Sequence, residues 1–386
     1  MKPQFKSMLF VRTLANGALR IGETFPGRAV EIEDGDGSIG RLIRLMDGSR
    51  SITQLHEELV KDYPETTVDV VGECIRELDG LGFLDDRSAL ERSTLRGNEL
   101  DRFKANLNFF SYYSTLEQSP WEMQERITTT RVTVIGLGAL GSGVLLQLAG
   151  CGVKRIRAID FDTVEPSNLN RQLLYNERDI GRLKVEAAAE FMSRFYSEME
   201  LETRVEEIRS ADDAKRAIEG SDVVVLAADQ PHFSLERWVN RACVELGVPL
   251  IGGGVNVIEG QCYTVIPVRT GCMDCNRLKQ SRLSEEHDAF IEAVRSSGFR
   301  MPSAAIAANY MLLAGMVCSE LVKYVTCMAP MMTEGKVISM HFGTFACREA
   351  MDFRSREEGC PTCGQGSPEE AADAEDGDLR LLECGL

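Results

Sequence analysis

The sequence lacks a surplus of positive charge, although it is rich in charged residues. Its 386 residues contain 43 Lys and Arg against 60 Asp and Glu, a formal net charge of −17. A protein that binds nucleic acid must neutralise phosphates with cationic side chains. An anionic membrane surface makes the same demand. The composition therefore argues against nucleic acid and membrane surfaces as partners.

Long hydrophobic runs are also missing. The nearest candidate for a membrane span, Ala304 to Cys318, contains Asn309 and is followed by charged residues. It predicts a buried helix instead. The apolar run at residues 8–11 is too short for a secretory signal, so we expect a cytosolic, reducing location. There, the 12 cysteines are more typical of metal binding or catalysis than of disulfides.

The first 90 residues have the pattern of a small separate domain. Short apolar runs at 8–12, 18–21 and 29–32 are split by glycine and proline, which is typical of a strand meander. Helical spacing of apolar residues follows in three segments, the second of them capped by Ser51. Three strands followed by three helices predict a winged-helix-like α+β domain. We interpret the polar residues 91–130 as a connector.

Residues 131–363 predict a Rossmann-like α/β domain. Helical patterns separate most of the apolar runs, so we expect a doubly wound, mostly parallel sheet with two later, antiparallel strands. The tail 364–386 has seven acids and one arginine and is predicted to be disordered. The predicted parallel strands cover 131–135, 155–160, 201–208, 222–227 and 249–252, and the later ones 261–268 and 336–342.

A glycine-rich turn follows the first of these strands. Gly136, Gly138 and Gly141 form a G-x-G-x-x-G pattern that opens a helix, and Asp160 ends the next strand. Glycines let backbone N–H groups approach a phosphate at a helix N-terminus, and the carboxylate can accept hydrogen bonds from ribose hydroxyls. The pattern alone predicts a nucleotide, of which NAD is the commonest.

Two cations and an acid favour a triphosphate over NAD. Arg171 can grip phosphates bidentately and Lys184 can act as a point charge, whereas hydride transfer needs neither. Asp229 follows a strand at the carboxyl edge of the sheet, where ligands bind, and can hold Mg²⁺ against phosphates. The alternative roles are a solvated surface pair for Arg171 and Lys184, and a helix cap for Asp229.

Four cysteines form two C-x₂-C pairs, Cys272 with Cys275 and Cys360 with Cys363. Two such pairs predict a tetrahedral zinc site. Four protein ligands leave no open position, so this zinc is expected to be structural. The four histidines form no cluster; a structural or solvent role is the better interpretation of His232, although it lies near Asp229.

Taken together, residues 131–363 resemble the ThiF/MoeB/HesA family of E1-like adenylating enzymes. The resemblance rests on the glycine turn, Asp160, the SNLNRQ string at 167–172, Lys184, Asp229 and the cysteine pairs. It implies adenylation of a carboxylate by Mg-ATP, and a homodimer. It further implies that the glycine turn and Asp160 hold the nucleoside, that Asn168, Arg171 and Lys184 hold the phosphates, and that Asp229 holds Mg²⁺.

Within the family, residues 228–240 look closest to the members that mature the ribosomally made peptides (RiPPs) microcin C and pantocin A. The first 90 residues are similar to a PqqD-like RiPP recognition element, which binds a leader peptide as an added strand. This implies activation of a carboxylate on a precursor peptide, followed by cyclisation or condensation. We expect leader contacts at strand 29–32 and the third helix, and expect the acids at 31–36 to favour basic leader residues.

Other functions stay open. One is adenylation of a Gly-Gly-ended sulfur carrier, which leaves the first 90 residues unexplained; another is a non-catalytic leader-binding partner protein. The thiol nucleophile of some sulfur-transfer members is absent, because 276–317 contain no cysteine. A DNA-binding winged helix is disfavoured by 17 acids against 12 bases in residues 1–95.

The family's Arg-x-x-Arg string reads Arg-Phe-Lys-Ala at 102–105, so Arg102 or Lys104 would have to replace the second arginine.

Overall fold

The computed structural model describes residues 1–25, 27–284, 286–297 and 304–364. The predicted disordered tail lies outside them, apart from Gly364. The chain forms two compact units, Met1–Arg126 and Ile127–Leu386, which are described separately.

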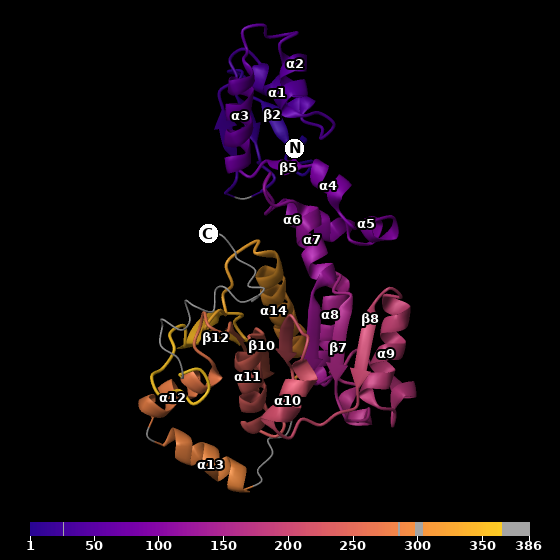
Figure 1. Ribbon diagram of the computed structural model, residues 1–386, viewed down its shortest axis with the longest axis vertical. Coiled ribbons are helices and arrows are strands. Elements are labelled where there is room, and N and C mark those ends of the chain that lie inside the picture. Colours follow the sequence, from indigo (N-terminus) through magenta and orange to yellow (C-terminus); the bar gives the residue numbers. More distant parts are fainter. Residues whose placement is uncertain (26, 285, 298–303, 365–386) are drawn as a thin grey trace. The chain divides into compact units, whose positions relative to one another are not determined.

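The N-terminal unit contains the expected three strands followed by three helices (Figure 1). The strands pair antiparallel in the order β2-β3-β4, so β4 is an edge strand. Ser51 caps the second helix, as predicted, and the structure shows that it does so through a capping box with Gln54. A further pair of short strands, β1 with β5, joins the two ends of the domain. The elements are β1 (Pro3–Phe5), β2 (Val11–Thr13), β3 (Leu19–Ile21), β4 (Val30–Ile32), α1 (Ser38–Leu45), α2 (Ile52–Leu59), α3 (Val68–Gly80) and β5 (Leu84–Asp86).

The segment interpreted as a connector is helical, and up to Arg126 it belongs to the same compact unit. Buried Lys6 ties the two parts together: its Nζ donates to the carbonyl of Gly82 at 2.8 Å and to that of Ser114 at 2.7 Å. Burial lowers the pKa of Lys6 to about 8. The helices are α4 (Ser88–Arg92), α5 (Asn98–Arg102), α6 (Lys104–Ser111) and α7 (Pro120–Thr129).

One eight-stranded sheet organises the C-terminal unit, in the order β13-β12-β11-β10-β9-β6-β7-β8. The stretch from β10 to β8 is parallel, and the remaining pairings are antiparallel. This confirms the predicted α/β fold class; β13 was not predicted. The strands are β6 (Arg131–Ile135), β7 (Arg155–Ile159), β8 (Glu200–Arg204), β9 (Val223–Leu226), β10 (Leu250–Val255), β11 (Glu259–Val265), β12 (Lys336–His341) and β13 (Cys347–Asp352).

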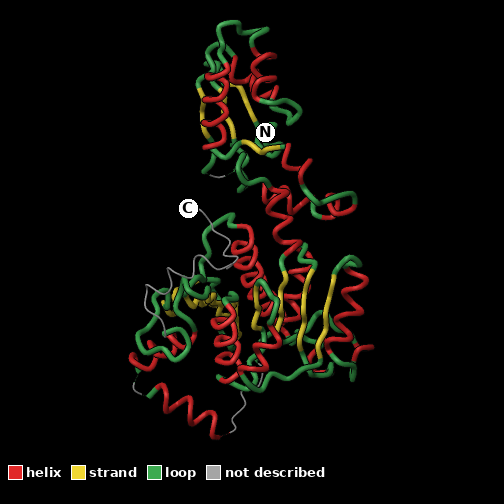
Figure 2. Tube along the Cα trace, in the orientation of Figure 1, coloured by secondary structure: helices red, strands yellow, loops and turns green. Residues whose placement is uncertain are grey.

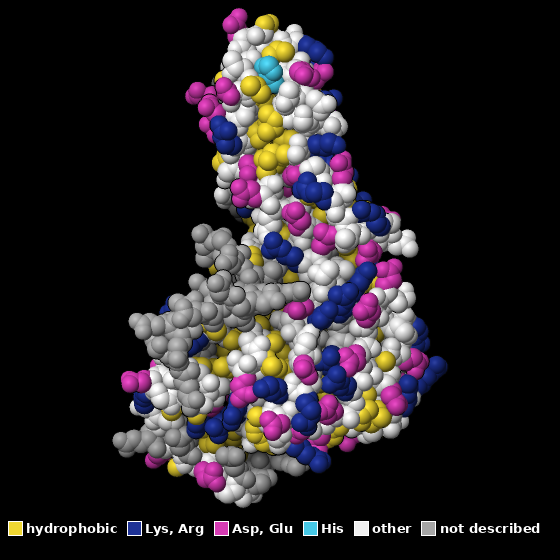
Figure 3. Space-filling model, in the orientation of Figure 1, with side chains coloured by type: hydrophobic (Ala, Val, Ile, Leu, Met, Phe, Trp, Pro, Cys, Tyr) yellow, Lys and Arg dark blue, Asp and Glu magenta, His cyan; other side chains and the backbone are white. Residues whose placement is uncertain are grey.

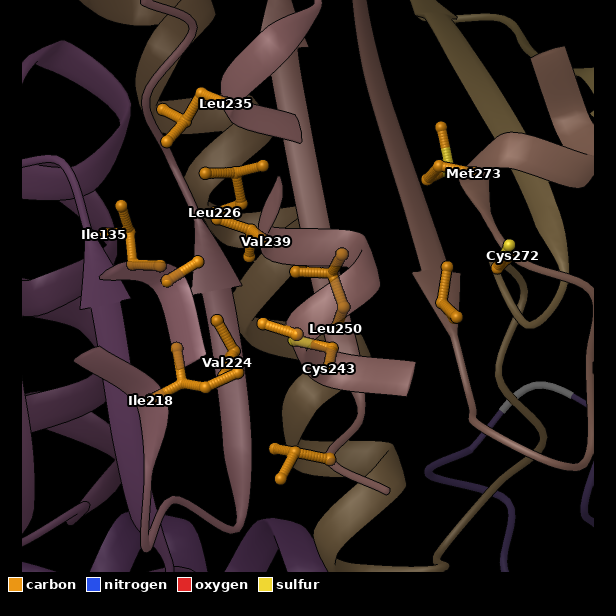
Figure 4. Packing of buried hydrophobic residues seen from close by; sticks show 14 of the residues in the cluster. Ile135, Ile218, Val224, Leu226, Leu235, Val239, Cys243, Leu250, Cys272 and Met273 are labelled. Atoms are coloured by element: carbon orange, nitrogen blue, oxygen red, sulfur yellow. The ribbon is translucent and has the colours of Figure 1, made fainter. Parts of the chain in front are cut away.

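Helices cover both faces of this sheet (Figure 2). Helix α8 packs against α14 and α9, whereas α10 and α11 pack against each other and enclose a core with β6, β9 and β10 (Figure 4). The helices are α8 (Ala139–Cys151), α9 (Lys184–Phe195), α10 (Ala211–Ile218), α11 (Ser234–Leu246), α12 (Met273–Leu283), α13 (His287–Ser297) and α14 (Ala307–Thr326). Among the described residues, no helix combines the length and apolar character that crossing a membrane requires.

The strand order creates a switch point at β6. From β6 the chain proceeds through β7 to β8 on one side, and it returns to pair β9 on the other. Ligands of open α/β sheets bind at such a point, outside the carboxyl ends of the strands. The segments that follow β6, β7 and β9 are therefore where a site is expected.

Candidate functional site

A cavity of about 620 Å³ lies at the switch point. Five of the residues predicted from the sequence line it: Gly136, Gly138, Asp160, Lys184 and Asp229. They come from the carboxyl ends of β6, β7 and β9 and from the start of α9. The structure therefore brings these predicted residues together.

The glycine turn is closely packed at Gly136 and Gly141 and open at Gly138. A Cβ on Gly141 would lie 1.8 Å from the Gly136 carbonyl oxygen, and Gly136 has a positive φ of 91°. In contrast, a Cβ on Gly138 would meet nothing within 4 Å. Gly138 is the N-cap of α8 and supplies no side-chain cap, which suits an anionic group at this helix N-terminus. The turn thus fits a nucleotide phosphate.

Asp160 is buried and held by backbone amides. Its Oδ2 accepts the N–H of Leu137 at 2.6 Å, and its Oδ1 accepts that of Asp162 at 2.8 Å. Burial raises the pKa of this carboxyl, while the nearby Lys184 lowers it. Each oxygen retains a lone pair, so the fixed carboxylate can accept ribose hydroxyls as the sequence predicts.

Lys184 is the first residue of α9, and its side chain is buried. Its Nζ donates to Asp162 Oδ2 at 2.7 Å. A phosphate entering the cavity would meet a cation whose position is already fixed.

Asn168 and Arg171 do not line the described part of the cavity. Asn168 Oδ1 accepts the N–H of Glu165 at 3.0 Å, and Arg171 Nη1 donates to the Ser167 carbonyl at 2.7 Å. Both side chains shape their own loop, and their phosphate contacts stay a prediction. Arg102 and Lys104 lie in the N-terminal unit, at the end of α5 and the start of α6.

A second cavity of about 560 Å³ meets the first one. The two share Ala228, Asp229, Gly253 and Gly254. Its wall contains Glu236 and Tyr263, which the sequence analysis missed, and His232, for which that analysis favoured a structural or solvent role. Asp229 therefore lines both cavities.

Asp274, also missed, links this second cavity to the cysteine pairs. It is buried between Cys272 and Cys275 in the chain, and its Oδ1 accepts Arg237 Nε at 3.2 Å. Its Oδ2 accepts the Thr362 hydroxyl at 2.5 Å. Asp274 thus ties the two cysteine pairs to each other and to α11.

The four predicted zinc ligands form one cluster. The Sγ atoms of Cys272, Cys275, Cys360 and Cys363 all lie within 4.8 Å of one another. The Sγ–Sγ distances are 3.6 Å for Cys272–Cys360, 3.2 Å for Cys275–Cys363 and 3.7 Å for Cys360–Cys363. Zn–S bonds of about 2.3 Å place tetrahedral ligands about 3.8 Å apart. The cluster therefore fits one tetrahedral metal ion.

Relatives with described functions resemble the chain in sequence. The SAMP-activating enzyme E1 of Haloferax volcanii is 28% identical over 287 residues, covering 72% of this chain and 94% of that protein. The adenylyltransferase and sulfurtransferase MOCS3 of Anopheles gambiae is 38% identical over 153 residues, covering 39% of this chain and 34% of MOCS3. The chain thus matches about a third of MOCS3.

Solved structures match over nearly the whole chain. MccB of E. coli in complex with ATP superposes with a TM-score of 0.71 at 22% identity, covering 94% of this chain and 100% of MccB. PaaA superposes with a TM-score of 0.69 at 24% identity, covering 90% and 99%. These matches show the same fold. The ThiF family model matches residues 111–362, so the chain belongs to the ThiF family of E1-like adenylating enzymes, as the sequence motifs predict.

Proposed function

We propose that the chain uses Mg-ATP to adenylate a carboxylate of a ribosomally made precursor peptide, and that cyclisation or condensation follows. The observation that carries this proposal is the pair of cavities joined at Asp229. One fits a nucleotide and the other offers room for a second substrate. MccB, whose fold the chain shares, was crystallised with ATP and, separately, with the peptide MccA.

The proposed roles follow from the geometry and the family. Gly136, Gly138, Gly141 and Asp160 hold the nucleoside and the first phosphate. Asn168, Arg171 and Lys184 hold the remaining phosphates and stabilise the leaving pyrophosphate. Asp229 holds Mg²⁺ where the phosphates meet the carboxylate. We assign zinc to the four-cysteine cluster. We also propose that the protein forms a homodimer and that it is located in the cytosol, where thiols stay reduced.

An exchange assay tests adenylation. Exchange of labelled pyrophosphate into ATP should require Mg²⁺ and a peptide with a free carboxylate. A panel of synthetic peptides, with free or amidated C-termini and with or without Asp and Glu, would identify that carboxylate. Mass spectrometry should find AMP and pyrophosphate as products; release of ADP would contradict an adenylate.

The second candidate is adenylation of a Gly-Gly-ended sulfur carrier. The long alignment with the SAMP-activating enzyme favours it. A purified Gly-Gly-ended carrier protein belongs in the same panel, and the substrate with the larger exchange rate at equal concentration decides between the two functions.

We further propose that the N-terminal unit binds the leader of the precursor. Among the described residues the short strand β4 pairs with β3 alone, so its other edge can accept a strand, and Val68 and Val70 on α3 are 44% and 47% exposed. Val30 and Ile32 of β4 pack with the buried residues of α3 in one cluster. Figure 3 shows hydrophobic side chains gathered on one face of this unit. An added strand would therefore find an apolar helix beside it.

Val70→Asp should weaken binding of the full-length precursor about tenfold, because it places a charge on this apolar surface. Adenylation of a leaderless peptide should stay unchanged. Val257→Asp, at another exposed valine, is the matched control. Fluorescence anisotropy measures the affinity, which should also fall as salt is raised if the acids at 31–36 attract a basic leader. Equal affinities for both variants would contradict leader binding at α3.

A further inference from the structure

Glu236 is a carboxyl group in the second cavity that the adenylation chemistry does not use. It lies in the first turn of α11. Its neighbour Arg237 pairs with Asp274 instead, as does Arg277 at 3.6 Å, so the ion pairs described in this cavity leave Glu236 out. Glu236 is half-buried, and burying a carboxyl without a cation is costly, so such groups concentrate at functional sites.

Tyr263 lines the same cavity as Glu236. A Cβ on Gly252 would lie only 2.2 Å from Tyr263 Cζ, so the tyrosine ring occupies the space of a side chain on β10. Its hydroxyl interacts with the Glu236 carboxyl. Among the residues that the structure describes, Glu236 therefore has a neutral hydroxyl beside it and no ion pair with a cation.

Glu236 lines the second cavity and is absent from the described lining of the first. Under the proposed function the nucleotide would occupy the cavity with the glycine turn, and the acyl carbon of its adenylate would lie near the shared residues Asp229 and Gly253. A nucleophile that approaches through the second cavity would enter the space that Glu236 lines.

We propose that Glu236 is the general base of the step that consumes the adenylate, and that Tyr263 is its positioning residue. This inference rests on the proposed function. A peptide nitrogen attacks the acyl carbon, the carbon–nitrogen bond forms and the bond to the AMP oxygen breaks. The electron pair leaves with AMP, and Glu236 accepts the proton of the attacking nitrogen.

Burial and the nearby charge of Asp274 raise the pKa of Glu236, and Tyr263 lowers it. A base acts when it is deprotonated, so amide formation should rise with pH through this raised pKa. The titratable and charged groups that face Glu236 across this cavity are Asp229, His232, Arg237, Tyr263, Asp274 and Arg277.

Glu236→Gln tests the assignment on the panel peptide with the fastest exchange. Pyrophosphate exchange should stay within about twofold of the parent, whereas the condensed product should fall about 100-fold. Hydroxylamine, already nucleophilic at neutral pH, should still convert the adenylate to a hydroxamate. Tyr263→Phe should move the acidic limb of the product pH profile to higher pH, which a purely structural role would not do. Glu245→Gln, on the same helix but outside both cavities, is the control.

Unchanged product formation in Glu236→Gln would overturn the assignment. Equal losses of exchange and product would also overturn it, because Glu236 would then act in binding or adenylation. If the parent enzyme shows no pyrophosphate exchange with any peptide of the panel, the proposed function is wrong. This inference then fails with it, before any variant is made.

Discussion

Replacing Lys184 by alanine should lower the rate of ATP–pyrophosphate exchange by about 10²–10³-fold, the effect expected from removing one fixed charge donor at a reacting phosphate. The ammonium group lies in the nucleotide cavity and is held 2.7 Å from Asp162. No other lysine or arginine lines the described part of this cavity. The phosphates would therefore lose their fixed cation there.

The loss has a second physical cause. Without Lys184, the carboxylates of Asp160 and Asp162 would face the phosphates without the nearby cation. Lys184 also lowers the pKa of Asp160 against the effect of burial. Its removal raises that pKa further, so the residual exchange should fall more steeply at acidic pH than the parent rate does.

Lys215→Ala is the matched control, because Lys215 also forms an ion pair, with Glu245 at 3.3 Å, but lines neither cavity. Thermal unfolding should show both variants folded. Lys184→Arg keeps the charge and should recover part of the rate. An exchange rate for Lys184→Ala close to that of Lys215→Ala would show that Lys184 does not hold the phosphates.

The nucleotide cavity could be predicted because its residues follow predicted strands. Gly136, Asp160 and Asp229 come directly after apolar runs, and parallel strands present their carboxyl ends at one edge. The cysteine cluster could be predicted because two C-x₂-C pairs have few other uses. In both places, short local sequence patterns contain the residue types that the chemistry needs.

The second cavity could not be predicted in this way. Glu236 comes from α11, Tyr263 from β11 and Asp274 from α12, and only the tertiary fold brings them together. Glu236 lies within residues 228–240, which the family resemblance singled out, but no spacing marked it as a base.

Two parts of the fold also could not be predicted from local sequence patterns. Strand β13 begins with three exposed residues, Cys347 to Glu349, so it shows no alternation of apolar and polar residues. The helices of residues 91–126 looked like a polar connector, because their ties to the first 90 residues are long-range. Lys6 and Ser114, for example, are 108 residues apart.

Cys360→Ser should give protein that is insoluble or has lost about 4 kcal/mol or more of its free energy of unfolding, since metal binding is coupled to folding. Cys360 is 2% exposed and packs with its three partner thiols inside the α11 core. A hydroxyl is a poor metal ligand, and an incomplete site leaves buried polar groups unpaired.

The cluster closes a loop of the chain, because its two pairs lie at the start of α12 and after β13. Loss of the metal should also weaken the hydrogen bond from the Thr362 hydroxyl to Asp274. Because Asp274 lines the second cavity, that part of its wall should become less ordered. Metal analysis should find about one zinc per parent chain and less in the variant. Cys347→Ser, at an exposed cysteine of β13, should keep both zinc and stability. A soluble, active Cys360→Ser protein without metal would show that the four thiols do not hold a structural ion.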